Sequence, residues 1–378
     1  MGELNKNNIN ELVAIAQNPK ESVAKAINDT GKKAVGCFPI YTPDEAIYAL
    51  GLLPVGMWGG PVKGNLADKY LQTFCCSIMK ANTEQALLGD YDLLSAVLVT
   101  SFCDTLKCII EDWKVAVPYL HIVPIVYPQN RKTPSGRAYL KAEIERVSAQ
   151  LEQVVGRKPY TEADLSAAVD LYDEYRAASQ DFVKAVSEKP GLLTASERHN
   201  VIKAAYFMDK ADYTPKLKAI TEEIKKADAP DAKNLTKVVV SGIINEPDGL
   251  LDIFDETGFT IVGDDLAQET RQFRTIAPKV GTGIERMVER IALQDGCAFL
   301  YDDKKLRGQM IIDLVKKTGA DAVFFNQLKF CDPEEFDWPI IKKELEAAKI
   351  PTLYIETEQQ MDSFEQTRTR LQAFAEII

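Results

Sequence analysis

Histidine is scarce in this chain, since only His121 and His199 occur among its 378 residues. Zinc sites usually draw on histidines and on closely spaced CxxC pairs, and the chain has no CxxC pair. A GxSxG elbow is also absent, so a zinc site and a Ser–His hydrolase are both disfavoured. We expect His121, within an apolar run, to be a satisfied core residue, and His199, in SERHN, to be exposed.

Nucleotide-binding motifs are missing as well. Neither GxGxxG nor a GxxxxGKS or GxxxxGKT loop occurs, and GTGIER (281–286) resembles a phosphate loop only superficially. No stretch reaches eighteen apolar residues, and the first twenty residues lack the apolar core of a secretory signal. We therefore expect a cytoplasmic protein with no nucleotide site of known type and no membrane partner.

The charge balance argues against a nucleic-acid partner. The chain has 45 basic and 56 acidic residues, a net charge of −11, whereas binding to phosphate backbones depends on clustered Lys and Arg. Hydrophobic residues make up 46% of the chain, which is typical of a globular protein. The length predicts two or three domains.

The order of apolar patterns predicts an α/β fold with two parallel-sheet lobes of the flavodoxin or Rossmann kind. An N-terminal helical arm (1–31) precedes a first α/β lobe (32–132), in which one helical pattern runs from Asp68 to Leu88. A helical insert (133–233), rich in Glu, Lys, Ala and Leu, separates it from a second α/β lobe (234–378). The predicted strands are AVGCFPI, LLPVGMW, SAVLVTS, YLHIVPIVY, TKVVVSGIINEP, TIVGDD, DAVFFNQ and IPTLYIE.

Seven cysteines, an odd number, make a disulfide framework improbable. Two of them, Cys103 in FCDT and Cys331 in FCDP, follow an apolar strand at the start of a helix. A helix N-terminus favours the thiolate, and ligands of open α/β sheets bind at the carboxyl ends of strands. Burial of the cysteine and helix capping by the acid would explain the same pattern. Glu45, early in another helix, is either a first-turn acid or an acid that faces the same cleft.

Four segments together resemble the 2-hydroxyacyl-CoA dehydratase family, which also contains the benzoyl-CoA reductase subunits. They are YTPDEAIYALGLLPV (41–55), FCCSIMKANTEQALLGDYDLLSAVLVTSFCDTLK (74–107), DAVFFNQLKFCDPEEFDWPIIKKELEAAKIPTLYIETE (321–358) and QTRTRLQAF (366–374). The match covers both α/β lobes in the same order. At 378 residues the chain is similar to the smaller, β-type subunit.

The resemblance implies a 4Fe-4S cluster between the lobes, held by three cysteines from separate parts of the chain. Carried over by motif, the ligands are Cys76, Cys103 and Cys331. Cys75 is adjacent to Cys76, and because one residue turns a helical side chain by about 100°, only one of the two is expected to point inward. The remaining cysteines, Cys37, Cys108 and Cys297, are expected to be core residues, with the role of Cys37 left open.

The family's chemistry is the reversible dehydration of an (R)-2-hydroxyacyl-CoA to a 2-enoyl-CoA by a ketyl-radical mechanism. The thioester does not acidify the β-hydrogen, so ordinary acid–base catalysis cannot readily remove it. In the family's proposed mechanism one injected electron forms a ketyl radical anion, which makes the β-hydrogen acidic. The resemblance implies a related α-type subunit as heterodimer partner and an ATP-dependent iron–sulfur activator as transient electron donor. Glu45 is the candidate for acid–base assistance, which requires a raised pKa.

Three alternatives stay open from the sequence. A benzoyl-CoA-reductase-like subunit would use the same cluster on an aromatic acyl-CoA. A non-catalytic α/β binding protein would bury all seven cysteines as hydrophobes. A zinc-dependent hydrolase with cysteine ligands is disfavoured by the low histidine content. The acyl chain of the substrate and the fourth cluster ligand cannot be read from the residues.

Overall fold

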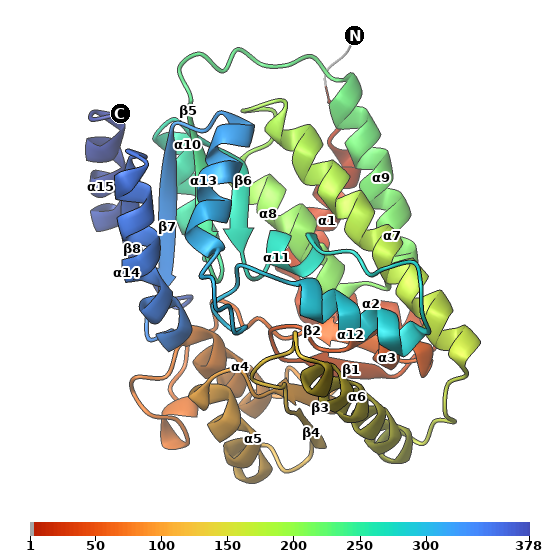
Figure 1. The fold of residues 1–378 in the computed structure, drawn as a ribbon. Helices are drawn as coiled ribbons and strands as arrows, with labels where there is room; N and C mark the ends of the chain where they lie inside the picture. The colour runs from red at the N-terminus through yellow and green to blue at the C-terminus, as the bar shows by residue number, and fades with distance from the viewer. Residues whose placement is uncertain (1–3) are drawn as a thin grey trace.

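The computed structural model describes residues 4–378 and contains two parallel sheets and a large helical body (Figure 1). The first sheet has the order β2-β1-β3-β4. Its strands are β1 (Ala34–Cys37), β2 (Leu53–Gly56), β3 (Leu94–Thr100) and β4 (Ile122–Ile125). The second sheet has the equivalent order β6-β5-β7-β8. Its strands are β5 (Thr236–Gly242), β6 (Phe259–Leu266), β7 (Ala322–Leu328) and β8 (Thr352–Thr357). All eight predicted strands and the α/β class are confirmed.

Both sheets consist of parallel strands, and their central strands are buried on both faces. β1 is buried throughout, and so is β7 with the sequence AVFFNQL. Parallel strands covered by helices on two sides need such continuous apolar runs, which is why they stand out in the sequence. In each sheet the chain leaves the first strand toward one side and then crosses to the other. The switch points therefore lie between β1 and β3 and between β5 and β7.

Helices cover the faces of both sheets. Those of the first half are α3 (Asp44–Ala49), α4 (Ser77–Leu87), α5 (Asp104–Ala116) and α6 (Pro134–Val155), with a 3₁₀ turn η1 (Ala67–Lys69). Those of the second half are α10 (Asp248–Glu256), α11 (Thr270–Phe273), α12 (Gly283–Leu293), α13 (Arg307–Thr318), α14 (Asp332–Ala347) and α15 (Glu365–Ala375). The single helix predicted from 68 to 88 is wrong: only η1 and α4 form there, because Cys76 has an extended backbone and begins α4 as its N-cap.

The N-terminal helices pack on the insert and form one helical body with it. Its members are α1 (Asn7–Gln17), α2 (Pro19–Thr30), α7 (Glu162–Ser187), α8 (Ala195–Lys203), η2 (Ala204–Phe207) and α9 (Lys210–Lys226). Ile9 and Leu12 of α1 are buried with Phe182 of α7 and Tyr213 of α9 in its core. α6 instead lies against β3 and β4. Between residues 4 and 378 no helix combines the length and the apolar character that crossing a membrane requires.

The second sheet points its strands at the first lobe. In Figure 1 the arrowheads of β6 and β7 are directed toward the first lobe. Gln359, just after β8, bridges the two lobes: its side-chain amide donates to the Trp58 carbonyl at 2.9 Å and its backbone N–H donates to Ser77 Oγ at 3.1 Å. The strand ends of the second sheet therefore face the first lobe, where a site shared by the two lobes can form.

Candidate functional site

Cys76, Cys103 and Cys331 line one small cavity between the two lobes, about 40 Å³ in volume. By the measure in which one water takes about 10–15 Å³, the cavity has room for roughly three water-sized atoms. The sequence separates these cysteines by as many as 255 residues (331 minus 76). Most of the other walls are apolar, formed by Pro39, Trp58, Ile78, Met79, Leu106, Ile243, Phe299, Leu328, Phe330 and Pro333. The thiols thus face a shared hollow, which is what the predicted ligand set requires.

Each of these three cysteines stands at the N-terminus of a helix. Cys76 is the N-cap of α4, Cys103 of α5 and Cys331 of α14. The Leu106 N–H donates to Cys103 Sγ at 3.4 Å. Cys103 and Cys331 also follow β3 and β7, the third strands of the two equivalent sheets. Three helix N-termini therefore direct N–H groups and positive dipole ends at one cavity, which suits a bound group with negative charge.

The acids of the two Cys-Asp pairs have a simpler role. The Asp104 side chain is 87% exposed and pairs with Lys107 at 3.0 Å, one turn further along α5. Asp332 is exposed in the first turn of α14. Carboxylates in a first turn gain from the helix dipole. The helix dipole therefore explains Asp104, whereas Asp332 is a first-turn acid that also lines the cavity beside Cys331.

Burial makes these thiols hard to ionise. Desolvation raises the pKa of Cys103 to about 12, although N–H groups of α5 act in the opposite direction. Desolvation likewise raises the pKa of Cys76 and raises that of Cys331 well above its usual range. At neutral pH the thiols alone hold their protons, and a coordinating metal would remove them.

The donor set consists of three thiols, the kind of ligand that iron–sulfur clusters use. Among residues 4–378, no group of three or more His, Cys, Asp and Glu side chains is arranged around one metal ion. Thiolates that bind a four-iron cluster each hold a different iron, so their sulfurs lie farther apart than ligands of one ion. Three thiols in a mostly apolar hollow offer the sulfur donors that such a cluster needs, and the hollow of about 40 Å³ would have to widen to admit its eight atoms.

The other cysteines divide into two groups. Cys75 is buried but does not line the cavity, whereas its neighbour Cys76 does. Cys37 and Cys297 are buried, as predicted. The prediction that Cys108 is a core residue is wrong, because its thiol lies on the exposed side of α5.

Glu45 lies outside the cysteine cavity, in a buried ion cluster on α3. Its carboxylate pairs with Arg176 of α7 and lies 3.5 Å from the Arg290 guanidinium of α12. Burial alone would raise its pKa, but the two guanidiniums outweigh burial and lower the pKa to about 2. The acid role requires a raised pKa, so this geometry describes a permanently ionised carboxylate rather than a proton donor.

Both predictions for the histidines are wrong. His199 is buried, with Nδ1 at 2.8 Å from Glu269 and Nε2 at 3.3 Å from Glu246. These two carboxylates outweigh the desolvation of the ring and raise the pKa of His199 to about 9. His121 is exposed just before β4. His199 therefore belongs to a buried charge network, and neither histidine lines the cysteine cavity.

Sequence reasoning missed a second buried charge network, directly behind Cys331. Glu334, one turn into α14, is fully buried between Arg271 and Arg307. Both arginines also bind Asp265 at the end of β6. The only local signal is an acid three residues after the cysteine, which is also typical of an ordinary first-turn acid.

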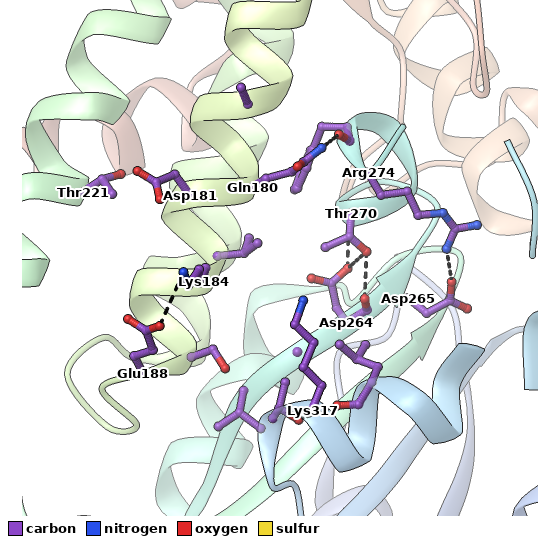
Figure 2. A pocket seen from close by; sticks show the side chains of 18 of the residues that line it. Gln180, Asp181, Lys184, Glu188, Thr221, Asp264, Asp265, Thr270, Arg274 and Lys317 are labelled. Carbon is purple, nitrogen blue, oxygen red and sulfur yellow. Dashed lines mark hydrogen bonds and ion pairs between the residues drawn. The ribbon is translucent and has the colours of Figure 1, made fainter. Parts of the chain in front are cut away.

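A second and larger pocket lies away from the cysteines. This hollow of about 1030 Å³ lies between α7 and α9 on one side and β6, α11 and α13 on the other (Figure 2). Its three aspartates already have partners: Asp264 accepts from the Thr270 hydroxyl at 2.7 Å, Asp265 from Arg274 at 2.8 Å and Asp181 from Lys225 at 2.7 Å. Because its acids are satisfied and its walls offer no thiol, we take the smaller cysteine cavity as the functional site despite the difference in size.

Two equivalent parallel-sheet lobes define an α/β protein whose candidate site is a cavity lined by three cysteines. The model of the family described as 2-hydroxyglutaryl-CoA dehydratase, D-component, matches residues 39–378, and the chain belongs to this family of dehydratase components. This confirms the assignment made from the four sequence segments.

Named relatives show how far the similarity extends. The chain is 41% identical to the (R)-phenyllactyl-CoA dehydratase beta subunit of Clostridium sporogenes and 42% identical to the lactoyl-CoA dehydratase subunit beta of Anaerotignum propionicum. Each alignment covers 98% of both chains. A benzoyl-CoA reductase subunit of Thauera aromatica is 25% identical, over 93% of this chain and 92% of its own. Similarity to the dehydratase subunits is therefore the stronger of the two.

Proposed function

We propose that the chain is the β-type, iron–sulfur subunit of an (R)-2-hydroxyacyl-CoA dehydratase, which reversibly forms a 2-enoyl-CoA. The observation that carries the proposal is the cavity lined by Cys76, Cys103 and Cys331, each at the start of a helix. The relatives add that full-length similarity at 41–42% identity is to beta subunits of dehydratases, against 25% to a reductase subunit. That difference favours dehydration over aromatic reduction.

In this proposal Cys76, Cys103 and Cys331 hold a 4Fe-4S cluster. When bound, the cluster would supply one electron to the thioester substrate and recover it, which gives the elimination its radical character. The thiols must lose their protons on binding, since burial raises their pKa values. The three helix N-termini then stabilise the negative charge that the thiolates bring.

The apolar walls protect the site from water. Trp58 and Met79 come from the first lobe, and Ile243 and Phe330 come from the second. Side chains of this kind lower the local polarity, and solvent exposure and hydrogen bonding to sulfur are what set the potential of a cluster. The chain's own contribution is therefore a mostly apolar pocket with three anchoring sulfurs, at which three helix N-termini meet.

The proposal includes three partners. A related α-type subunit forms the heterodimer, as the word beta in the names of the relatives suggests for those proteins. An ATP-dependent iron–sulfur activator supplies the electron, which fits the absence of GxGxxG and of a P-loop motif from the chain itself. The substrate is an acyl-CoA that the heterodimer binds in the cytoplasm.

Iron analysis of single cysteine variants tests the proposal. The full chain, purified without oxygen, should be brown and hold about four irons and as many sulfides. Cys76→Ser, Cys103→Ser and Cys331→Ser should each lose most of this iron. Cys108→Ser is the matched control, because Cys108 lies on the same helix that Cys103 caps but is exposed, and it should keep the iron. A colourless wild-type protein, or full iron in the Cys331 variant, would contradict the assignment.

A further inference from the structure

The first turn of α14, which begins at Cys331, is held by a buried carboxylate. Glu334 is fully buried and accepts from Arg271 Nη1 at 3.1 Å and from Arg307 Nη2 at 2.8 Å. Each of its carboxylate oxygens thus has a guanidinium partner of its own. Charge-assisted bonds of this kind are short and directional, so they fix the side chain.

The two arginines are fixed in turn by a second carboxylate. Arg271 donates to Asp265 through Nε at 3.1 Å and through Nη2 at 2.9 Å, and Arg307 donates to Asp265 through Nε at 2.8 Å. Arg307 also donates to Ser241 Oγ at 3.1 Å. Asp265 lies at the end of β6 and Ser241 at the end of β5, so the clamp on Glu334 is anchored in the second sheet.

This clamp reaches Cys331 through the backbone of one helical turn. The Glu334 N–H donates to the Cys331 carbonyl at 3.0 Å, and so does the Glu335 N–H. The Glu334 side chain cannot move without moving the turn whose first residue carries the thiol. By contrast, Cys103 is held by a direct contact, the N–H of Leu106 on its own sulfur.

Stability alone does not account for these charges. Burying ions removes them from water, and apolar residues of similar size often serve a fold as well or better. Here two carboxylates and two guanidiniums are buried behind a residue of the candidate site. The negative member nearest along the chain to Cys331 is Glu334, one helical turn from that residue.

We propose that Glu334, held by Arg271 and Arg307, is a positioning residue that aims the Cys331 thiol into the cavity and sets the electrostatic field at its sulfur. The field effect rests on the proposed iron–sulfur function, whereas the positioning effect does not. Glu335, the next residue, is exposed on the same turn and offers a matched control.

The first measurement uses the full chain purified without oxygen and loaded with iron and sulfide. Removing a fixed negative charge stabilises the reduced cluster. At the wild-type midpoint potential, Glu334→Gln should therefore raise the ratio of reduced to oxidised cluster about tenfold, a shift of about 59 mV for one electron. Glu335→Gln should stay within about twofold of wild type by the same spectroscopic readout. Equal midpoints in the two variants, both with full iron, would overturn the field effect.

The second measurement uses the iron-free chain and iodoacetamide, with alkylation of each cysteine followed by mass spectrometry. Glu334→Gln should speed alkylation of Cys331 about tenfold, while Cys76 and Cys103 stay within about twofold of wild type. Equal rates at Cys331 in Glu334→Gln and Glu335→Gln, or a joint rise at all three cysteines, would overturn positioning. If the wild type binds no iron, the proposed function fails, and this measurement still decides the positioning role.

A conservative variant covers the case in which Glu334→Gln does not fold. Glu334→Asp keeps the charge but withdraws it by one methylene from the two guanidiniums. It should speed alkylation of Cys331 about threefold and leave the reduced-to-oxidised ratio within about threefold of wild type. Wild-type alkylation of Cys331 in this variant would contradict the positioning role.

Discussion

Replacing Glu45 by Gln separates a structural role from a catalytic one. The variant keeps the size of the side chain but removes its charge, and it leaves Arg176 and Arg290 buried without their shared carboxylate. We expect a lower free energy of unfolding. If Glu45 acts mainly by holding α3, α7 and α12 together, activity per folded molecule should change little.

The magnitude follows from the pKa of Glu45. Its two arginine neighbours lower the pKa from 4.5 to about 2. A difference of about 2.5 units, at about 1.36 kcal/mol per unit, corresponds to roughly 3 kcal/mol of stabilisation by the charged form. Breaking a buried pair by removing one partner typically costs about 3–5 kcal/mol, which agrees.

The lowered pKa of Glu45 also determines how its contribution to stability changes with pH. Because the folded-state pKa is lowered, the contribution is fully present above 4.5 and is lost as the pH falls through about 2. Urea unfolding followed by circular dichroism should show a difference of about 3 kcal/mol between wild type and Glu45→Gln at pH 7, and a smaller one toward pH 3. Glu145→Gln, an exposed glutamate on α6, should unfold as the wild type does.

Activity decides between the two roles. A carboxylic acid with a pKa of about 2 is almost entirely ionised at neutral pH, so it is a poor proton donor and a weak base. Removal of a working general acid or base lowers the rate about 10²–10⁴-fold. Wild-type stability of Glu45→Gln together with a loss of that size would refute the structural reading and restore Glu45 as a catalytic residue.

Two further predictions concern stability. Glu246 and Glu269 raise the pKa of His199 to about 9, so the charged ring contributes roughly 3 kcal/mol to the free energy of unfolding. This contribution is complete below pH 6.5 and is lost as the pH rises through 9. The free energies of unfolding of wild type and His199→Asn should therefore differ less at pH 9.5 than at pH 6, and a constant difference would contradict this. Gly242→Ala at the end of β5 would place Cβ 2.2 Å from the Asn326 carbonyl oxygen, so it should cost about 2–3 kcal/mol by thermal unfolding. Gly31→Ala, at φ 64° with open space around it, should cost about 1 kcal/mol, and equal costs for the two would count against the clash.

The fold could be predicted because its determinants are local. Buried parallel strands must be apolar on both faces, so each strand is visible as a short run in the sequence. The two Phe-Cys-Asp segments follow β3 and β7, and the matching strand orders of the two sheets explain why the segments lie at equivalent places. The helix expected across 68–88 was wrong because the extended backbone of Cys76 begins α4 later.

The buried charges could not be predicted, because their partners are distant in the sequence. The polar segment SERHN predicts an exposed His199. The residue is buried instead, because its partners Glu246 and Glu269 lie 47 and 70 residues away in the sequence. Glu334 is 63 residues from Arg271 and 27 from Arg307. Composition and periodicity describe one segment at a time, whereas such contacts exist only after the sheets have formed.

The division of the three cysteines between the lobes has a mechanical consequence. Cys76 and Cys103 belong to the first lobe and Cys331 to the second, and Gln359 ties the lobes together beside Cys76. Any rocking of one lobe against the other must therefore stretch or compress the triangle of sulfurs. Under the proposed function, a protein that docks across both lobes can act on the cluster by changing the angle between the lobes, without touching a single sulfur atom.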